Sequence, residues 1–87
     1  MTLELLKQAK RKTIGSKQTM RGVCSGRVAN VFLASDAEDH VIKPLQQLCD
    51  EKAIPYLMVE SMLSLGKACG IRIGAAAAGI MKETDLN

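Results

Sequence analysis

Val28-Ala29-Asn30-Val31-Phe32-Leu33-Ala34 is the stretch of sequence that decides the fold. Its apolar and β-branched residues follow one another without the alternation of a half-exposed strand, which predicts a strand buried on both faces. Such a strand must be covered by helices on each side. The stretch therefore predicts the central layer of an α/β protein.

Helix and strand patterns alternate on both sides of this strand. We expect helices at 3–11, 16–25, 44–52 and 62–69, and further extended segments at 13–14, 55–59 and 71–81. A polar loop at 36–40 precedes the third helix. This order predicts a three-layer α/β/α sandwich with a mixed sheet of about four strands.

Capping residues place the ends of three helices. Ser16 is a good N-cap for the second helix and Gly26 ends it. Pro44 is tolerated only in a first turn, so the regular part of the third helix is expected to begin there. Ser61 is expected to cap the start of the fourth helix, and Gly70 to end it.

The segment from Ile71 to Met81 carries conflicting signals. Propensity alone makes Ala75–Ala78 helical, but Ile71-Arg72-Ile73 alternates like a strand and two glycines disfavour a helix. We expect a final strand lined with small residues beneath close-packed helices. The chain is predicted to be one domain, 1–87, with an ordered core at about 3–82 and a frayed end at Thr84–Asn87.

Charge is distributed unevenly along the 87 residues. Residues 1–27 hold seven Lys or Arg and only Glu4, whereas residues 28–87 hold five Lys or Arg and eight Asp or Glu. This asymmetry indicates one basic surface and an acidic ligand, although a lysine-rich solvated helix remains an alternative. With Phe32 and Tyr56 as the only aromatic residues, a platform of stacking rings is excluded.

Other classes of protein have weak support. The three cysteines form no CxxC pair, so we expect no disulfide framework and no metal site, with Cys24 and Cys69 buried and His40 on the surface near a helix start. No apolar run approaches the roughly 18–20 residues of a membrane helix, and the leucines precede the basic residues at the amino end, the reverse of a secretory signal. We therefore expect a cytoplasmic protein. Walker and Ser/His/Asp patterns are also missing, so we expect neither catalytic activity nor a cofactor.

Gly15-Ser16-Lys17-Gln18-Thr19-Met20-Arg21 is the candidate binding segment. A glycine turn that opens a helix presents unpaired N–H groups, which attract phosphate. Lys17 and Arg21 lie four residues apart on one helix face, and the amide of Gln18 can bond to a base edge. The segment predicts nucleic-acid binding, with ordinary solvated surface residues as the alternative.

Two separated motifs give the chain a family resemblance. Gly15-x-Lys17-Gln18-Thr19, and Leu65-Gly66-Lys67-Ala68-Cys69-Gly70-Ile71 before a Gly/Ala-rich strand, resemble the L-seven-Ae / L-thirty-e ribosomal protein superfamily, especially its short bacterial members of the YbxF type. The resemblance covers nearly everything from Leu5 to Met81. It implies the three-layer fold and a kink-turn ligand, which is a bent RNA helix with a bulge beside sheared G·A pairs.

The resemblance also assigns roles to residues. The start of the second helix, with Gly15 and Ser16, enters the widened groove, where Lys17 and Gln18 contact guanine edges and Arg21 binds phosphate or base oxygens. The loop before the fourth helix covers the bulged nucleotide, and it is formed here by Val59, Glu60 and Ser61, with Val59 as an apolar floor and Ser61 near phosphate.

Two positions depart from the family pattern. Archaeal members have Asn-Glu in place of Lys17-Gln18, and Pro in place of Glu60, so this chain can differ from them in affinity or target. A ribosomal RNA or the ribosome is among the partners that the resemblance implies. Since no exposed heptad is present, we expect a monomer. A protein-interaction module of the same fold, using the acidic residues of 36–39 and 50–51, is the alternative function.

Overall fold

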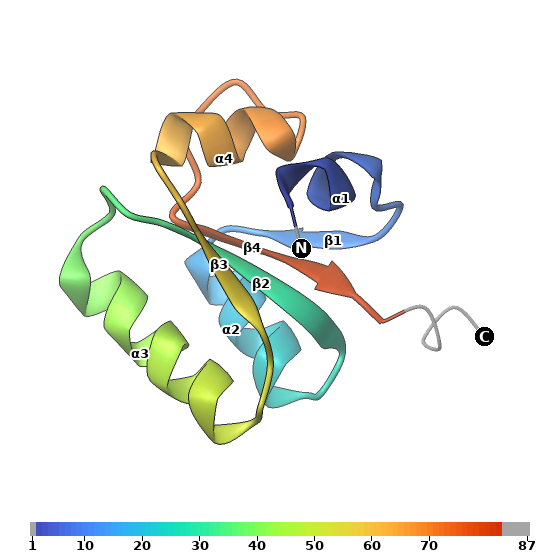
Figure 1. Ribbon diagram of the computed structural model, residues 1–87, viewed down its shortest axis with the longest axis vertical. Helices are drawn as coiled ribbons and strands as arrows, with labels where there is room; N and C mark the ends of the chain where they lie inside the picture. Colours follow the sequence, from blue (N-terminus) through green and yellow to red (C-terminus); the bar gives the residue numbers. More distant parts are fainter. Residues whose placement is uncertain (1, 83–87) are drawn as a thin grey trace.

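The structure, a computed structural model, describes residues 2–82 and has three layers (Figure 1). A four-stranded sheet lies between the helix pair α1 and α4 on one face and the pair α2 and α3 on the other. The elements in chain order are α1 Leu3–Gln8, β1 Lys12–Ile14, α2 Ser16–Cys24, β2 Val28–Ala34, α3 Asp39–Glu51, β3 Tyr56–Val59, α4 Met62–Ala68 and β4 Ala77–Met81. The predicted α/β/α sandwich and its mixed sheet are confirmed.

The sheet has the strand order β1-β4-β2-β3. β2 and β3 are parallel, while β4 is antiparallel to both β1 and β2. One row of the sheet runs through Ile14, Ala78, Phe32 and Leu57. The carboxyl ends of β1, β2 and β3 therefore lie at one end of the sheet, together with the start of β4.

The core is aliphatic and is built around β2, as its sequence predicts. Val31, Phe32, Leu33 and Ala34 are fully buried. The neighbouring strand β4 supplies only small buried residues at 77–79, and a Cβ on Gly79 would come within 2.8 Å of Thr13 Oγ1. Small side chains on β4 therefore let the helices approach the centre of the sheet.

Two helices begin at places other than those predicted. Gly15, not Ser16, is the N-cap of α2, because its φ of 99° is one that L side chains rarely adopt. α3 begins at Asp39 and contains Pro44, which leaves the carbonyl of His40 without its helical partner. Pro44 is exposed, so water can bond to that carbonyl.

Helical spacing predicts that Cys24 and Met62 are core positions, and the structure corrects both. Cys24 is exposed, because the buried face of α2 consists of Thr19, Gly22 and Val23 and is rotated away from it. Met62 is 36% exposed, since Leu65 and Ala68 form the buried side of α4.

The predicted long final strand is limited to 77–81, and residues 71–73 belong to a loop. The segment Thr84–Asn87 lies outside the described residues. Within residues 2–82, no helix has both the length and the apolar character that crossing a bilayer requires.

Candidate functional site

The start of α2 is fixed by backbone hydrogen bonds to the sheet. The Gly15 amide donates to the carbonyl of Ala77 at the beginning of β4 (2.8 Å), and the Gly15 carbonyl accepts from the Thr19 amide (3.0 Å). The buried hydroxyls of Thr13 and Thr19 lie 2.9 Å apart and join β1 to α2. The first turn of α2 is therefore held rigidly at the end of the sheet.

The side-chain amide of Gln18 is oriented by the edge strand. Its Oε1 accepts a hydrogen bond of 2.8 Å from the amide of Ile14. Because the amides of Gly15 and Met81 bond across the β1–β4 pair, the alternation of an antiparallel ladder turns the Ile14 N–H to the free edge. The side-chain oxygen of Gln18 is thus bonded within the protein, and the side-chain NH₂ group is left to donate outward.

The two basic residues of the segment lie beside this amide. Lys17 and Arg21 are exposed, and neither forms an ion pair with a residue of the range 2–82. A surface hollow of about 450 Å³ is lined by Gly15, Ser16, Lys17, Gln18 and Arg21, together with Ile14. The structure thus brings together the five predicted residues at the start of α2.

The predicted loop at 59–61 lies elsewhere on the same end of the sheet. β3 is three strand spacings from β1, which is about 14 Å. Val59 is only 4% exposed and packs in the core, so it offers almost no apolar surface to a ligand. Glu60 is exposed, and its Oε1 accepts from the Ser64 hydroxyl at 3.5 Å.

The polar groups at the start of α4 are already bonded within the protein. Ser61 Oγ accepts from the Ser64 amide at 3.0 Å, as a capping residue does. The amide of Met62 donates to Asp36 Oδ1 at 2.8 Å. These contacts assign Ser61 a structural role in starting the helix.

The loop between α4 and β4 ends next to the start of α2, and its residues 71–76 were predicted to be part of a strand. This α4–β4 loop, residues 69–76, runs into Ala77, whose carbonyl holds the Gly15 amide. Ile73 in this loop is 72% exposed. An apolar side chain left in water on the loop that leads to the start of β4 is a feature of a binding surface.

Close packing against α4 holds the α4–β4 loop in place. A Cβ on Gly66 would lie 1.9 Å from the carbonyl oxygen of Ile73, so only glycine fits at this position. The amide of Ala75 also donates to the carbonyl of Met62 at 3.0 Å. The sequence contains a signal for this contact, because Gly66 interrupts an otherwise regular helical pattern and glycine in a helix often marks a close approach.

The buried thiols are kept protonated by their surroundings. Burial raises the pKa of Cys49 above its ordinary value, and the neighbouring Asp50 carboxylate raises it further. Burial also raises the pKa of Cys69, against the opposing effect of the Lys12 ammonium. Among residues 2–82, no group of three or more His, Cys, Asp or Glu side chains is placed to hold a metal ion.

Comparison with known proteins shows the family to which the chain belongs. The profile of the ribosomal protein L7Ae/L30e/S12e/Gadd45 family matches residues 1–87. The chain is 43% identical over 68 residues to the RNA-binding protein TTE2299 of Caldanaerobacter subterraneus, a match that covers 78% of this chain and 83% of that one. It is 39% identical over 82 residues to the RNA-binding protein YbxF of Geobacillus stearothermophilus, covering 94% of this chain and all of that one.

Solved structures show the same fold. The 15.5kD RNA binding protein of Giardia lamblia superposes with a TM-score of 0.83 at 29% identity, over 97% of this chain and 73% of that chain. A protein of unknown function from Bacillus halodurans superposes with a TM-score of 0.80 at 30% identity, over 94% of this chain and 82% of that chain.

Proposed function

The chain belongs to the ribosomal protein L7Ae/L30e/S12e/Gadd45 family, and we propose that it is an RNA-binding protein that recognises and stabilises kink-turns through the start of α2. The observation that carries the proposal is the oriented amide of Gln18, which is fixed by Ile14 and flanked by Lys17 and Arg21, two cations without an ion pair among residues 2–82. The names of the relatives support RNA as the ligand.

The shape of this site suits a bent RNA better than a regular duplex. An A-form helix has a deep, narrow major groove whose base edges are inaccessible to side chains, so a helix end can reach them only where the RNA is distorted. A protein that binds the kinked form better than the extended form stabilises the kink by that difference in affinity. The rigid first turn of α2 fits an opening of this kind.

Each exposed group then has a chemical role. The NH₂ group of Gln18 donates to acceptors on a base edge, such as guanine O6 or N7. Lys17 and Arg21 neutralise phosphates that crowd together at the bend. Ile73 covers an unstacked base with its apolar surface, a role that the sequence alone assigned to Val59.

We propose a ribosomal or ribosome-associated RNA as the class of target, on the support of the family description. The alternative function, a protein-interaction module that uses its acidic residues, has less support from the contacts. Asp36 is bonded to the start of α4, while Glu38 and Asp39 pair with His40 and Lys43 at 3.3 and 3.8 Å. Each of the three carboxylates at 36–39 is thus already in contact with a polar group of the protein.

Binding to two hairpins tests the proposal. One hairpin contains a kink-turn, and in the other the sheared G·A pairs are replaced by Watson–Crick pairs. We expect tight binding to the first only, at low and high salt, and loss of this preference when Lys17, Gln18 and Arg21 are all changed to alanine. A control with Lys43→Ala, Gln47→Ala and Lys52→Ala removes the same charge and one amide from exposed positions of α3 and its C-cap. Weak, strongly salt-dependent binding to both hairpins would refute the proposal.

A further inference from the structure

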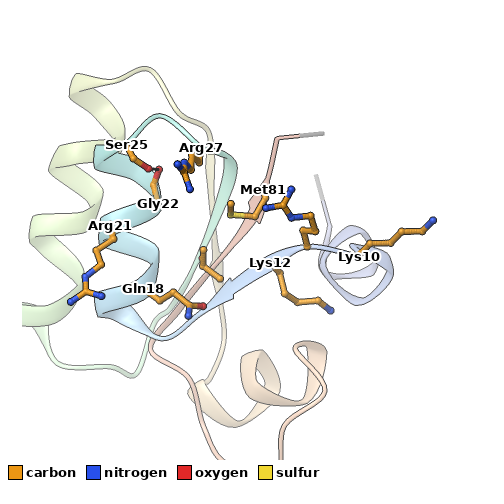
Figure 2. A pocket seen from close by; sticks show the side chains of 10 residues that line it. Lys10, Lys12, Gln18, Arg21, Gly22, Ser25, Arg27 and Met81 are labelled. Atoms are coloured by element: carbon orange, nitrogen blue, oxygen red, sulfur yellow. Dashed lines mark hydrogen bonds between the residues drawn. The ribbon is translucent and has the colours of Figure 1, made fainter. Parts of the chain in front are cut away.

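A concave basic surface extends beyond the start of α2. This basic groove runs between α2 and the edge strand β1, has a volume of about 570 Å³, and is lined by Lys10, Arg11, Lys12, Gln18, Arg21 and Arg27 among others (Figure 2). Along α2 it reaches from Gln18 to Ser25 at the C-cap, which is about 10 Å at the rise of an α-helix.

The basic groove is continuous with two neighbouring hollows. It shares Gln18 and Arg21 with the hollow at the start of α2, and it shares Lys10 with a hollow of about 380 Å³ that contains Lys82. The cations that line the three hollows are Lys10, Arg11, Lys12, Lys17, Arg21, Arg27 and Lys82. Six of these seven cations come from residues 1–27. The fold therefore gathers most of the basic residues of this segment on one surface.

Two of the cations that line the basic groove, Lys10 and Arg27, have no ion-pair partner among residues 2–82. Among the residues that the structure describes, none that lines the three hollows is acidic. Lys7, by contrast, pairs with Glu4 at 3.6 Å outside the groove. A concave surface of one sign concentrates a ligand of the opposite sign.

The chemistry of the lining selects phosphate over bases. Its walls contain no aromatic ring on which a base could stack, and its basic side chains are exposed, apart from Lys12, whose Nζ donates to the carbonyl of Leu6 at 3.1 Å. Exposed lysine and arginine contacts to phosphate position a nucleic acid without reading its sequence.

We propose that the basic groove binds the phosphate backbone of one helical arm that leaves the kink. This inference rests on the proposed function, because the groove begins at Gln18 and Arg21, where the kink itself is bound. It adds a second, sequence-independent contact to RNA on the side of α2 that faces β1.

Arm length tests the inference. The RNAs are a kink-turn with two full arms, the same kink-turn with one or the other arm shortened to a few base pairs, and a plain duplex as long as a full arm. The groove variant carries Lys10→Ala and Arg27→Ala, both at exposed positions. The control variant carries Lys43→Ala and Lys52→Ala, which removes the same charge outside the three hollows.

We expect the groove variant to bind the full-length kink-turn about tenfold more weakly than wild type, with a log–log salt slope smaller by about 1.8 for two lost phosphate contacts. Shortening one particular arm should abolish the difference between the two proteins. Equal losses for groove and control variants, or a loss that does not depend on arm length, would overturn the inference. If wild type fails to prefer the kink-turn but the groove variant still loses affinity for the plain duplex, the kink-turn proposal fails and the groove remains an RNA site.

Discussion

The change Gln18→Glu tests the orientation of the amide most directly. It replaces only the side-chain nitrogen of Gln18, whose side-chain oxygen is already bonded within the protein. Oε1 can keep the 2.8 Å hydrogen bond from the Ile14 amide. The outward NH₂ group becomes a second carboxylate oxygen, so a donor is replaced by an acceptor at unchanged size. Stability and RNA binding should then respond in opposite directions.

For stability, a carboxylate is favourable at this position. The first turn of α2 has no acidic residue, and a negative charge there interacts with the helix dipole by about 0.3–1 kcal/mol. For a chain of this size, 1 kcal/mol corresponds to about 4–8 °C in the melting temperature. We therefore expect Gln18→Glu to unfold a few degrees higher than wild type.

For RNA binding, the same change removes a donor from the base contact. Only the NH₂ group is available to the base, and a single hydrogen bond contributes about 0.5–1.5 kcal/mol, so we expect the affinity for a kink-turn to fall by about 2- to 12-fold. Calorimetric titration with the hairpin and thermal unfolding of the same preparation measure the two effects. Equal or tighter binding by Gln18→Glu would show that the RNA presents donors to this residue, and the reasoning from the oriented amide would be refuted. A lower melting temperature would contradict the contact with Ile14.

Four further predictions concern the α4–β4 loop and the cysteines. Ile73→Ala, at a 72% exposed position, should leave the melting temperature within about 2 °C of wild type but weaken binding to a kink-turn with a bulged base, as measured by titration. Gly66→Ala should lower the free energy of unfolding by about 2–3 kcal/mol in denaturant titration, because its Cβ would strike the Ile73 carbonyl; an unchanged midpoint would contradict this contact. Iodoacetamide should modify Cys24 alone in the folded protein at pH 8, and all three cysteines in denaturant, as mass spectrometry can count. Since burial raises the pKa of Cys49 and Cys69 above 9.0, the free energy of unfolding should fall as the pH rises past about 9.

The fold was largely predictable because its main determinants are local patterns. The continuous apolar run of β2 and the small residues of β4 identify the two central strands whatever surrounds them. The errors occur where backbone conformation or helix rotation decides. The positive φ of Gly15 moves the N-cap by one residue, and a rotation of α2 exposes Cys24, neither of which residue type alone specifies.

Of the candidate site, only the part formed by residues close together in the sequence could be predicted. Lys17, Gln18 and Arg21 lie within one turn and a residue of one another, so helical periodicity alone places them together. Ile73 lies on the loop that leads into β4, and β4 pairs with β1 from more than sixty residues away in the chain. Gly66 indicates that a close approach occurs but does not identify the segment that approaches. The family resemblance placed the apolar contact on Val59, a side chain that the structure buries.

The hydrogen bonds around α2 indicate which partner changes shape on binding. Gly15 is bonded to β4 through its amide, Gln18 is bonded to β1, and the buried Thr13–Thr19 pair joins the strand to the helix. Moving the first turn of α2 would break several of these bonds together, each worth about 0.5–1.5 kcal/mol. An RNA junction that already exchanges between extended and bent forms can adapt at lower cost. A fixed protein surface that binds the bent form better than the extended one shifts the RNA equilibrium toward the kink. Under the proposed function, the rigidity of this hydrogen-bond network is therefore what would stabilise the kink.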